Sequence, residues 1–98
     1  EYRKGTEWKA HLRKLANYRL SERWKIISQR VRKRDKYECR MCGREEGLRV
    51  HHLHYDNVFN ERDVDLITLC ADCHTAIHYD ESGKRRRDWK RWNPKPVA

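Results

Sequence analysis

The chain has 98 residues, of which 37% are hydrophobic and 40% are charged. A single small domain of this composition cannot bury a large apolar core, so we expect an additional stabilising feature such as a metal site. No run approaches the roughly 20 apolar residues of a membrane span, and no apolar N-terminal run resembles a signal peptide. We therefore expect a cytoplasmic protein that does not enter a membrane.

The net charge of +9 is distributed unevenly along the chain. Residues 1–36 carry a balance of +9, residues 37–83 a balance of −6, and residues 84–98 a balance of +6. Basic flanks suit a polyanion because each phosphate contact releases counterions, although a solvated charged surface is the alternative. We expect one domain over residues 1–98, made of a basic helical lead-in (1–36), a core (37–80) and a basic tail (81–98).

Two helices are predicted in the lead-in. Residues 6–16 place apolar residues at helical spacing, and residues 17–20 are expected to connect this short amphipathic helix to the next. Ser21 is a suitable N-cap for a second helix, whose apolar stripe is Trp24, Ile27 and Val31. Lysines and arginines cover much of both helices and leave a basic surface that the packing of two apolar stripes does not explain.

Two cysteine pairs, Cys39 with Cys42 and Cys70 with Cys73, have the CxxC spacing of zinc-binding turns. Gly43 permits the left-handed backbone that such a turn often needs. Four thiolates form a closed tetrahedral set, so we predict a structural Zn²⁺ in a reducing compartment rather than disulfides. Four free buried thiols are the alternative.

The central segment predicts two strands followed by a helix. Residues 48–53 alternate as a strand, residues 54–63 are polar and irregular, and residues 66–69 form a second short strand. Residues 71–79 have a helical pattern. Residues 84–94 are expected to form a basic arm without a core pattern. Its Trp89 and Trp92 could stack on a ligand or pack back onto the first helix, and we expect at least one of them to pack.

Four histidines accompany these elements. Adjacent residues of a strand point to opposite sides, so we expect His51 and His52 to divide between metal binding and contact with substrate. His74 and His78 are four residues apart on a helix and share one face, the usual geometry of paired ligands. Up to three imidazoles can thus surround one divalent cation with positions left open, as in a catalytic site.

In combination, several runs resemble the HNH endonucleases: Leu48–Leu53, Asp65–His74, Ala76–His78, Ser21–Trp24 and Arg34–Cys39. The resemblance is to the branch found in phages and prophages that carries two zinc-binding CxxC pairs, and it covers residues 18–80. It implies a small zinc-stabilised α+β domain, in which a ββα-metal (HNH) core follows N-terminal basic helices and precedes a C-terminal basic arm.

The same resemblance implies roles for individual residues. It assigns His52 as the general base, and His51, His74 and His78 as ligands of the catalytic ion. Asp65 occupies the position of the Asn in the family's name. It could orient His52, raise its basicity or reach the metal, and the sequence leaves these roles open. Asn57 and Asn60 in the loop are weaker candidates for the same role.

The family mechanism implies an endonuclease that hydrolyses phosphodiester bonds of DNA and leaves 5′-phosphate and 3′-hydroxyl ends. One active site would nick one strand, so a monomer would nick, whereas a weak homodimer could cut both strands. A histidine-rich site favours Mn²⁺ over Mg²⁺, with Ni²⁺ and Co²⁺ as further candidates. The phage branch also implies packaging proteins as partners.

Basic residues of the second helix and of the arm are the predicted DNA-binding residues. We expect phosphate contacts, low sequence specificity, and binding that weakens steeply with salt. A zinc-stabilised DNA-binding module without catalysis and an RNA-directed nuclease are the alternatives. The predicted contacts are Arg30, Lys33, Arg34, Arg85, Arg86, Arg87, Lys90 and Arg91.

Overall fold

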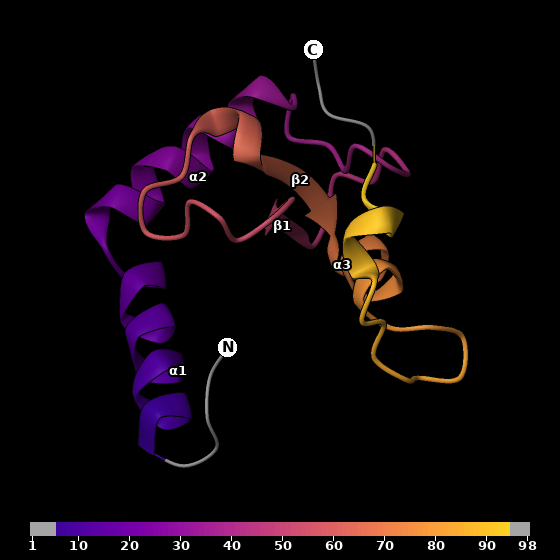
Figure 1. Cartoon of the computed structure of the whole chain (residues 1–98). Coiled ribbons are helices and arrows are strands. Elements are labelled where there is room, and N and C mark those ends of the chain that lie inside the picture. Colours follow the sequence, from indigo (N-terminus) through magenta and orange to yellow (C-terminus); the bar gives the residue numbers. More distant parts are fainter. Residues whose placement is uncertain (1–5, 95–98) are drawn as a thin grey trace.

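The computed structural model describes residues 6–94, except for the side chains of residues 6–9 and 11. The elements follow in the order α1 (Thr6–Arg19), α2 (Glu22–Arg34), β1 (Leu48–His52), η1 (Asp63–Asp65), β2 (Leu66–Cys70), α3 (Ala71–His78) and η2 (Trp89–Trp92) (Figure 1). The two η elements are short 3-10 helices. The expected α+β fold with a ββα core is confirmed. No helix in the described part is long and apolar enough to cross a membrane.

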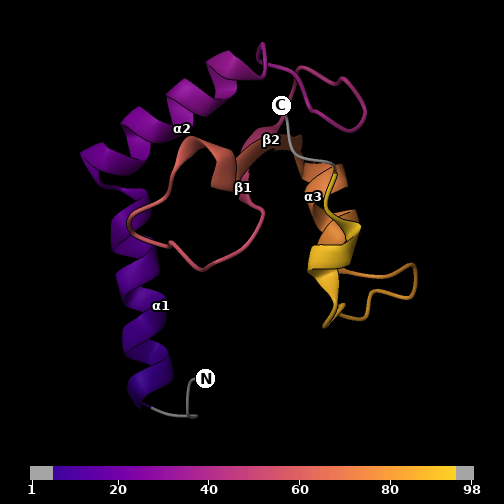
Figure 2. The same ribbon diagram turned by 45° about the horizontal axis from the view of Figure 1, so that its top comes forward.

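The two lead-in helices meet at a sharp turn. The Ser21 side chain accepts a hydrogen bond from the Trp24 N–H at 3.2 Å, which confirms Ser21 as the N-cap of α2. The expected connection over residues 17–20 is wrong, because α1 continues to Arg19. α2 passes over the sheet, whereas α1 leads away from it (Figure 2), and Leu12 of α1 remains 45% exposed.

The two strands pair antiparallel, with His51 opposite Ile67. All five residues of β2 are buried, so the strand does not alternate apolar and polar positions. Leu66 packs against the apolar residues of α2, whereas Ile67 and Leu69 pack against Ile77 of α3. This arrangement places β1, with the tandem histidines at its end, in contact with both helices.

A buried carboxylate joins the end of α2 to the sheet. Asp35 is 0% exposed and accepts hydrogen bonds from the Arg34 guanidinium at 2.9 and 3.0 Å and from the Thr68 N–H at 2.9 Å. Arg34 also donates to the carbonyls of Asp63 and Leu66, at 2.7 Å each. Because the buried charge is paired and hydrogen-bonded, this network can hold α2 against β2 without an unsatisfied ion.

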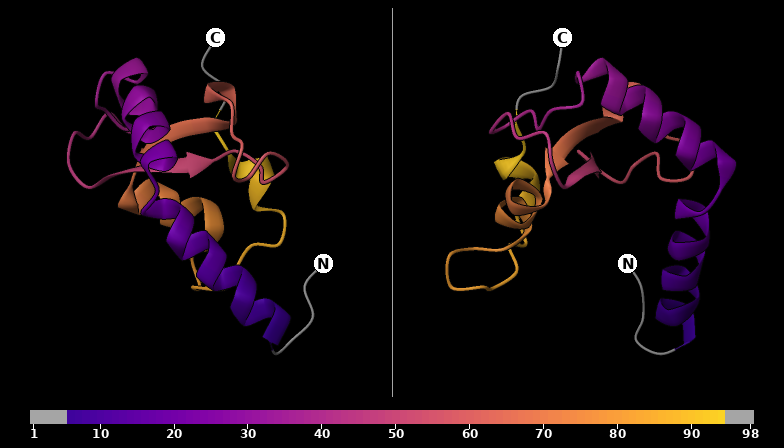
Figure 3. Two further views of the ribbon diagram at one scale, coloured as in Figure 1. Left: turned by 90° about the vertical axis from the view of Figure 1, so that its left-hand side faces the viewer. Right: turned by 180° about the vertical axis from the view of Figure 1, so that it is seen from behind.

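The C-terminal arm folds back on the core. The N–H of Arg86 donates to the carbonyl of His78 at 2.8 Å, and η2 then lies against α3 (Figure 3). Trp89 of η2 is 9% exposed and belongs to the same apolar cluster as the buried residues of β2 and α3. The expectation that a tryptophan of the arm packs back on the molecule is confirmed for Trp89, although it packs against β2 and α3 and not against the first helix.

Candidate metal centres and active site

The four cysteines lie together at one end of the sheet. Their Sγ atoms all lie within 4.8 Å of one another, and Cys42 Sγ lies 3.6 Å from Cys70 Sγ. Cys39 opens a turn in which Gly43 has φ +80°, the left-handed conformation predicted for it. Cys70 ends β2 and caps α3, where its Sγ accepts a hydrogen bond from the Cys73 N–H. Local turn geometry thus positions each pair.

This cysteine cluster fits a structural Zn²⁺. A tetrahedral ion with Zn–S bonds of about 2.3 Å holds its sulfurs about 3.8 Å apart, close to the 3.6 Å between Cys42 and Cys70. Burial raises the pKa of Cys39, but hydrogen bonds from neighbouring backbone N–H groups outweigh it and bring the pKa to about 6. Burial and the other sulfurs raise the pKa of Cys73. Four thiolates so close together would repel one another, so the four cysteines do not all ionise without a cation. A cation that binds all four thiolates offsets this repulsion.

His51 on β1 and His74 and His78 on α3 form a second group of metal-binding side chains. One ring nitrogen from each lies within 4.8 Å of the others. The ring centroids are 5.0 Å apart for His51 and His74, 5.3 Å for His51 and His78, and 4.7 Å for the pair on α3. The structure therefore brings together the three imidazoles that the sequence selects as ligands of one ion.

All three imidazoles are neutral at physiological pH. Burial lowers the pKa of His51, which is 1% exposed, to about 4, although its hydrogen bond to Asn93 opposes the shift. Burial also lowers the pKa of His74 to about 4, with His78 as the next cause, and it lowers the pKa of His78. A neutral imidazole is the form that binds a metal. Three such donors fit a divalent ion with open coordination positions.

Asn93, directly after η2, fixes the orientation of His51. Its Oδ1 lies 2.8 Å from His51 Nε2, and its Nδ2 donates to the Leu53 carbonyl at 2.7 Å. Because Oδ1 can only accept, Nε2 carries the proton and Nδ1 keeps the lone pair that a metal requires. Trp89 packs beside the same group, with its ring centroid 5.6 Å from that of His51 and 4.8 Å from that of His78. Sequence reasoning missed Asn93, since nothing marks an amide in a basic arm as a partner of β1.

His52 lies next to this group and has its own carboxylate partner. Its Nε2 lies 2.7 Å from Glu61 Oε2, so the ring donates this N–H to the carboxylate and keeps a lone pair on Nδ1. The Tyr18 hydroxyl donates to the other Glu61 oxygen. Trp24 stacks on the His52 ring at a centroid distance of 5.3 Å and an interplanar angle of 7°. Residues from the loop and from both lead-in helices thus hold this ring.

Glu61 is ionised although it is only 4% exposed. Burial alone would raise its pKa, but hydrogen bonds from Tyr18 and His52 outweigh burial and leave the pKa below its usual value. Burial and the hydrogen bond to Glu61 raise the pKa of Tyr18 to about 12, so the phenol remains a donor. Sequence reasoning missed Glu61 because Asp56 and Asp63 lie in the same loop and spacing does not distinguish the three acids.

Asp65 makes its contacts with residues of the loop and not with His52, the residue it was expected to orient. It accepts hydrogen bonds from the backbone and side chain of Arg62 and from Asn57, and His54 Nε2 lies 3.1 Å from its Oδ1. These contacts lower the pKa of Asp65 although burial opposes the shift. Among the described residues, the carboxylate that hydrogen-bonds the expected general base is that of Glu61.

Two of the three predicted DNA-binding residues of α2 already have internal partners. Arg30 makes a bidentate contact with Asp63, with a shortest distance of 2.7 Å. Arg34 belongs to the buried network at Asp35, and Lys33 is exposed. The count of basic residues therefore overestimates the free positive charge on this face of α2.

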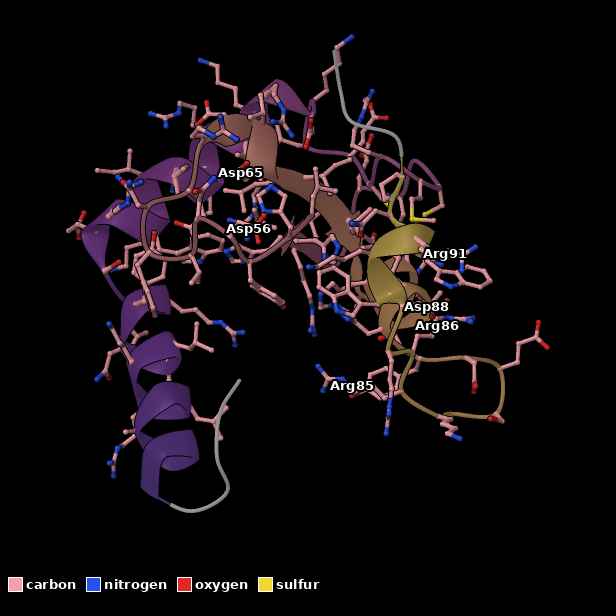
Figure 4. The ribbon with its side chains drawn as sticks, in the orientation of Figure 1. Asp56, Asp65, Arg85, Arg86, Asp88 and Arg91 are labelled. Atoms are coloured by element: carbon pink, nitrogen blue, oxygen red, sulfur yellow. The ribbon has the colours of Figure 1, made fainter. Side chains whose placement is uncertain are left out.

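The predicted DNA-binding residues of the arm point in different directions. Arg86 lies over the Trp92 ring at 3.7 Å, and Arg91 lies 3.8 Å from Asp88. Arg85 extends toward the side of the molecule on which α1 lies, whereas Arg86 and Arg91 lie on the other side of the arm (Figure 4). The remaining two, Arg87 and Lys90, are exposed.

The histidines open into one pocket of about 410 Å³. His51, His52, His74 and His78 all line it, together with Trp24, and the pocket lies between α2, β1 and α3. His52 and the three converging imidazoles therefore line the same space. A substrate in this space can contact both.

An antiparallel strand pair is followed by a helix, and this ββα core brings together three converging histidines and a fourth held by a carboxylate. Residues 39–80 match the family model described as HNH endonuclease. The match contains both cysteine pairs and all four histidines of the pocket, so this segment is similar to the HNH endonucleases. Comparisons with curated proteins and with solved structures found no match.

Proposed function

We propose that the chain is a metal-dependent DNA endonuclease that hydrolyses phosphodiester bonds and nicks one strand with low sequence specificity. The observation that supports this most is the shared pocket of His52, held by Glu61, and of the group His51, His74 and His78. A DNA-binding module without catalysis has no use for a fixed basic nitrogen beside three metal-binding imidazoles.

His52 acts as the general base in this proposal. Glu61 accepts the proton of Nε2, which leaves Nδ1 as the proton acceptor, and the stacked Trp24 ring restrains rotation of the imidazole. Nδ1 takes a proton from water, and the oxygen of that water attacks a backbone phosphorus. Glu61 stabilises the imidazolium that results, as a carboxylate does in a catalytic triad.

The two groups of ligands hold two different ions. The four cysteines hold the structural Zn²⁺. His51, His74 and His78 hold the catalytic divalent ion, which when bound supplies stabilisation of charge on a phosphate oxygen and on the leaving 3′ oxygen. Three nitrogen donors suit Mn²⁺ better than Mg²⁺, and Ni²⁺ or Co²⁺ would also be accepted.

The segments on either side of the HNH core act with it as one domain. Tyr18 and Trp24 of the lead-in contact Glu61 and His52, and Asn93 of the tail contacts His51. Asp65 in this arrangement holds the conformation of the active-site loop and does not itself orient the base. One such site cuts one strand, so a monomer produces nicks.

Nicking of supercoiled plasmid in Mn²⁺ tests the proposal. We expect wild type to convert the plasmid to open circles with ligatable 3′-hydroxyl ends, and His52→Ala to be slower by about 10²- to 10⁴-fold, the usual contribution of a general base. His54→Asn is the matched control, because His54 contacts Asp65 and is outside the described lining of the pocket.

Two further comparisons in the same assay test the identity of the catalytic ion and of the substrate. Mg²⁺ should support slower nicking than Mn²⁺ at equal concentration, and single-stranded RNA of matched length should be cut more slowly than DNA. Equal nicking by wild type and His52→Ala would remove His52 from its role, and preferential cleavage of RNA would change the substrate.

A further inference from the structure

Four arginines surround the histidines in the pocket. They come from four segments of the chain: the end of α1, the last turn of α2, the strand β1 and the C-terminal arm. Three of them are absent from the DNA contacts predicted from the sequence. We call the set the arginine rim, and its members are Arg19, Arg32, Arg49 and Arg85.

The charge of the arginine rim is not neutralised by the described part of the chain. Arg30 and Arg34 of α2 pair with carboxylates, whereas no member of the rim forms an ion pair with an Asp or Glu whose side chain is described. The described lining of the pocket also contains no acidic residue. The rim therefore leaves a concentration of positive charge around neutral imidazoles.

The arginine rim and the histidines line the same pocket. Its described lining includes the three imidazoles that converge and all four arginines of the rim. A ligand in this pocket can therefore contact the guanidinium groups and the histidines together.

An anion is the ligand that this arrangement can bind. Like charges that converge on a pocket repel one another, and a bound anion turns that repulsion into attraction. Guanidinium forks match the oxygens of a phosphate and can bind them bidentately. Because the rim is built from four separate segments around the pocket, it suits consecutive phosphates of one backbone better than a single small anion.

We propose that the arginine rim binds the phosphates of DNA on either side of the scissile bond. The inference rests on the proposed endonuclease function and specifies how that site holds its substrate. It moves the main DNA contact of α2 from Arg30 and Arg34, which are already paired, to Arg32, which lines the pocket with the histidines.

Salt-dependent binding measures these contacts directly. The test uses the zinc-loaded full chain with His52→Ala, a fluorescent duplex oligonucleotide and no added second metal, and follows anisotropy from low to moderate salt. Each phosphate contact contributes about 0.9 to the slope of log K against log salt. Arg32→Gln and Arg49→Gln should each lower the slope by about 0.9, and the double variant by about 1.8.

Two matched variants separate the rim from general charge. Arg40→Gln removes the same charge from an exposed residue outside the described pocket lining, and should leave the slope within error of the parent. Arg49→Lys should keep the slope and bind more weakly, because an ammonium keeps the charge and loses the fork. Lys33→Gln lowering the slope, with the rim variants unchanged, would overturn the proposal.

The binding and cleavage measurements can refute the two proposals separately. If wild type nicks plasmid but Arg32→Gln and Arg49→Gln bind like the parent, the endonuclease function stands and the rim does not. If the rim variants lose their phosphate contacts but wild type never nicks, the rim stands as a DNA-binding site and the proposed catalysis does not.

Discussion

Replacing Glu61 by glutamine asks whether His52 is a positioned general base. The substitution keeps the shape of the side chain but removes the charge that accepts the Nε2 proton across 2.7 Å. A hydrogen bond to a charged group contributes about 1.5–3 kcal/mol, and about 1.4 kcal/mol corresponds to tenfold in rate. We therefore expect kcat for nicking to fall about 10- to 150-fold. KM for DNA should change little, because Glu61 is buried and lies outside the described pocket lining.

The assay is conversion of supercoiled to open-circular plasmid at saturating Mn²⁺, with KM taken from a DNA titration. Glu81→Gln removes an equal charge from an exposed loop and should leave kcat unchanged. Asp65→Asn should lower the melting temperature through its loop contacts more than it lowers kcat. A Glu61→Gln protein as active as wild type, beside an Asp65→Asn protein that is folded but slow, would refute the assignment of Glu61.

Four further outcomes are expected. Cys70→Ser should lose zinc and fold cooperatively no longer, since zinc binding supplies folding free energy; a stoichiometric zinc content with a native circular dichroism spectrum would contradict this. Arg34→Gln should lower the free energy of unfolding in urea by about 2–3 kcal/mol, somewhat below the cost of breaking a fully buried pair because the arginine is 27% exposed; an unchanged urea midpoint would show that the network is dispensable. Asn93→Leu should weaken Mn²⁺ binding measured by calorimetry about 10- to 100-fold with zinc content unchanged, and equal affinity would remove the amide from that role. His51 and His74 have folded pKa values of about 4, below the usual value of about 6.5 in an unfolded chain, so the unfolded state binds more protons between these limits. Stability without the second metal should therefore be full above about pH 6.5 and fall as the pH drops toward 4, and urea midpoints that stay level over this range would exclude buried neutral histidines.

The metal-binding residues are the part of the site that a sequence reveals best, because their geometry is local. Cys39 and Cys42 need only one turn to converge, and His74 and His78 need only one helical repeat. The strand pairing that brings β1 to α3 also follows from the short apolar run of β2. Spacing therefore predicts both groups of ligands without knowledge of the loops.

The residues that orient those side chains are hidden in the sequence because they act across long separations. Glu61 is held by Tyr18, 43 positions earlier, and Asn93 reaches His51 across 42 positions. Their positions depend on how a loop and an arm settle against the helices. Phe59 in that loop has φ +72°, a conformation that no propensity rule predicts for a bulky residue. The residue type alone therefore does not distinguish Glu61 and Asn93 from the other polar residues near them in the sequence.

Positive charge along the sequence does not show which basic residues have carboxylate partners, for a related reason. A basic residue is free to bind phosphate only if no carboxylate already holds it, and partners are a property of the folded chain. Arg34 serves the buried Asp35, whereas Arg49 on β1 lies in the pocket beside the histidines. For the proposed DNA contact, the position of an arginine relative to the histidines therefore matters more than the density of basic residues along the chain.

The matched segment, residues 39–80, contains every proposed metal ligand and the proposed base but not all of the residues that hold them. Trp24 covers the face of the His52 ring, and Asn93 satisfies the buried nitrogen of His51. Without these flanks, His51 would keep a buried N–H with no acceptor, which costs about 1–3 kcal/mol, and His52 would lose the stacked ring that restrains it. The flanking segments are therefore part of the active-site framework, and the same two segments place Arg19, Arg32 and Arg85 at its rim. In the proposed mechanism, orientation of the catalytic groups and binding of the DNA backbone thus depend on one packing arrangement.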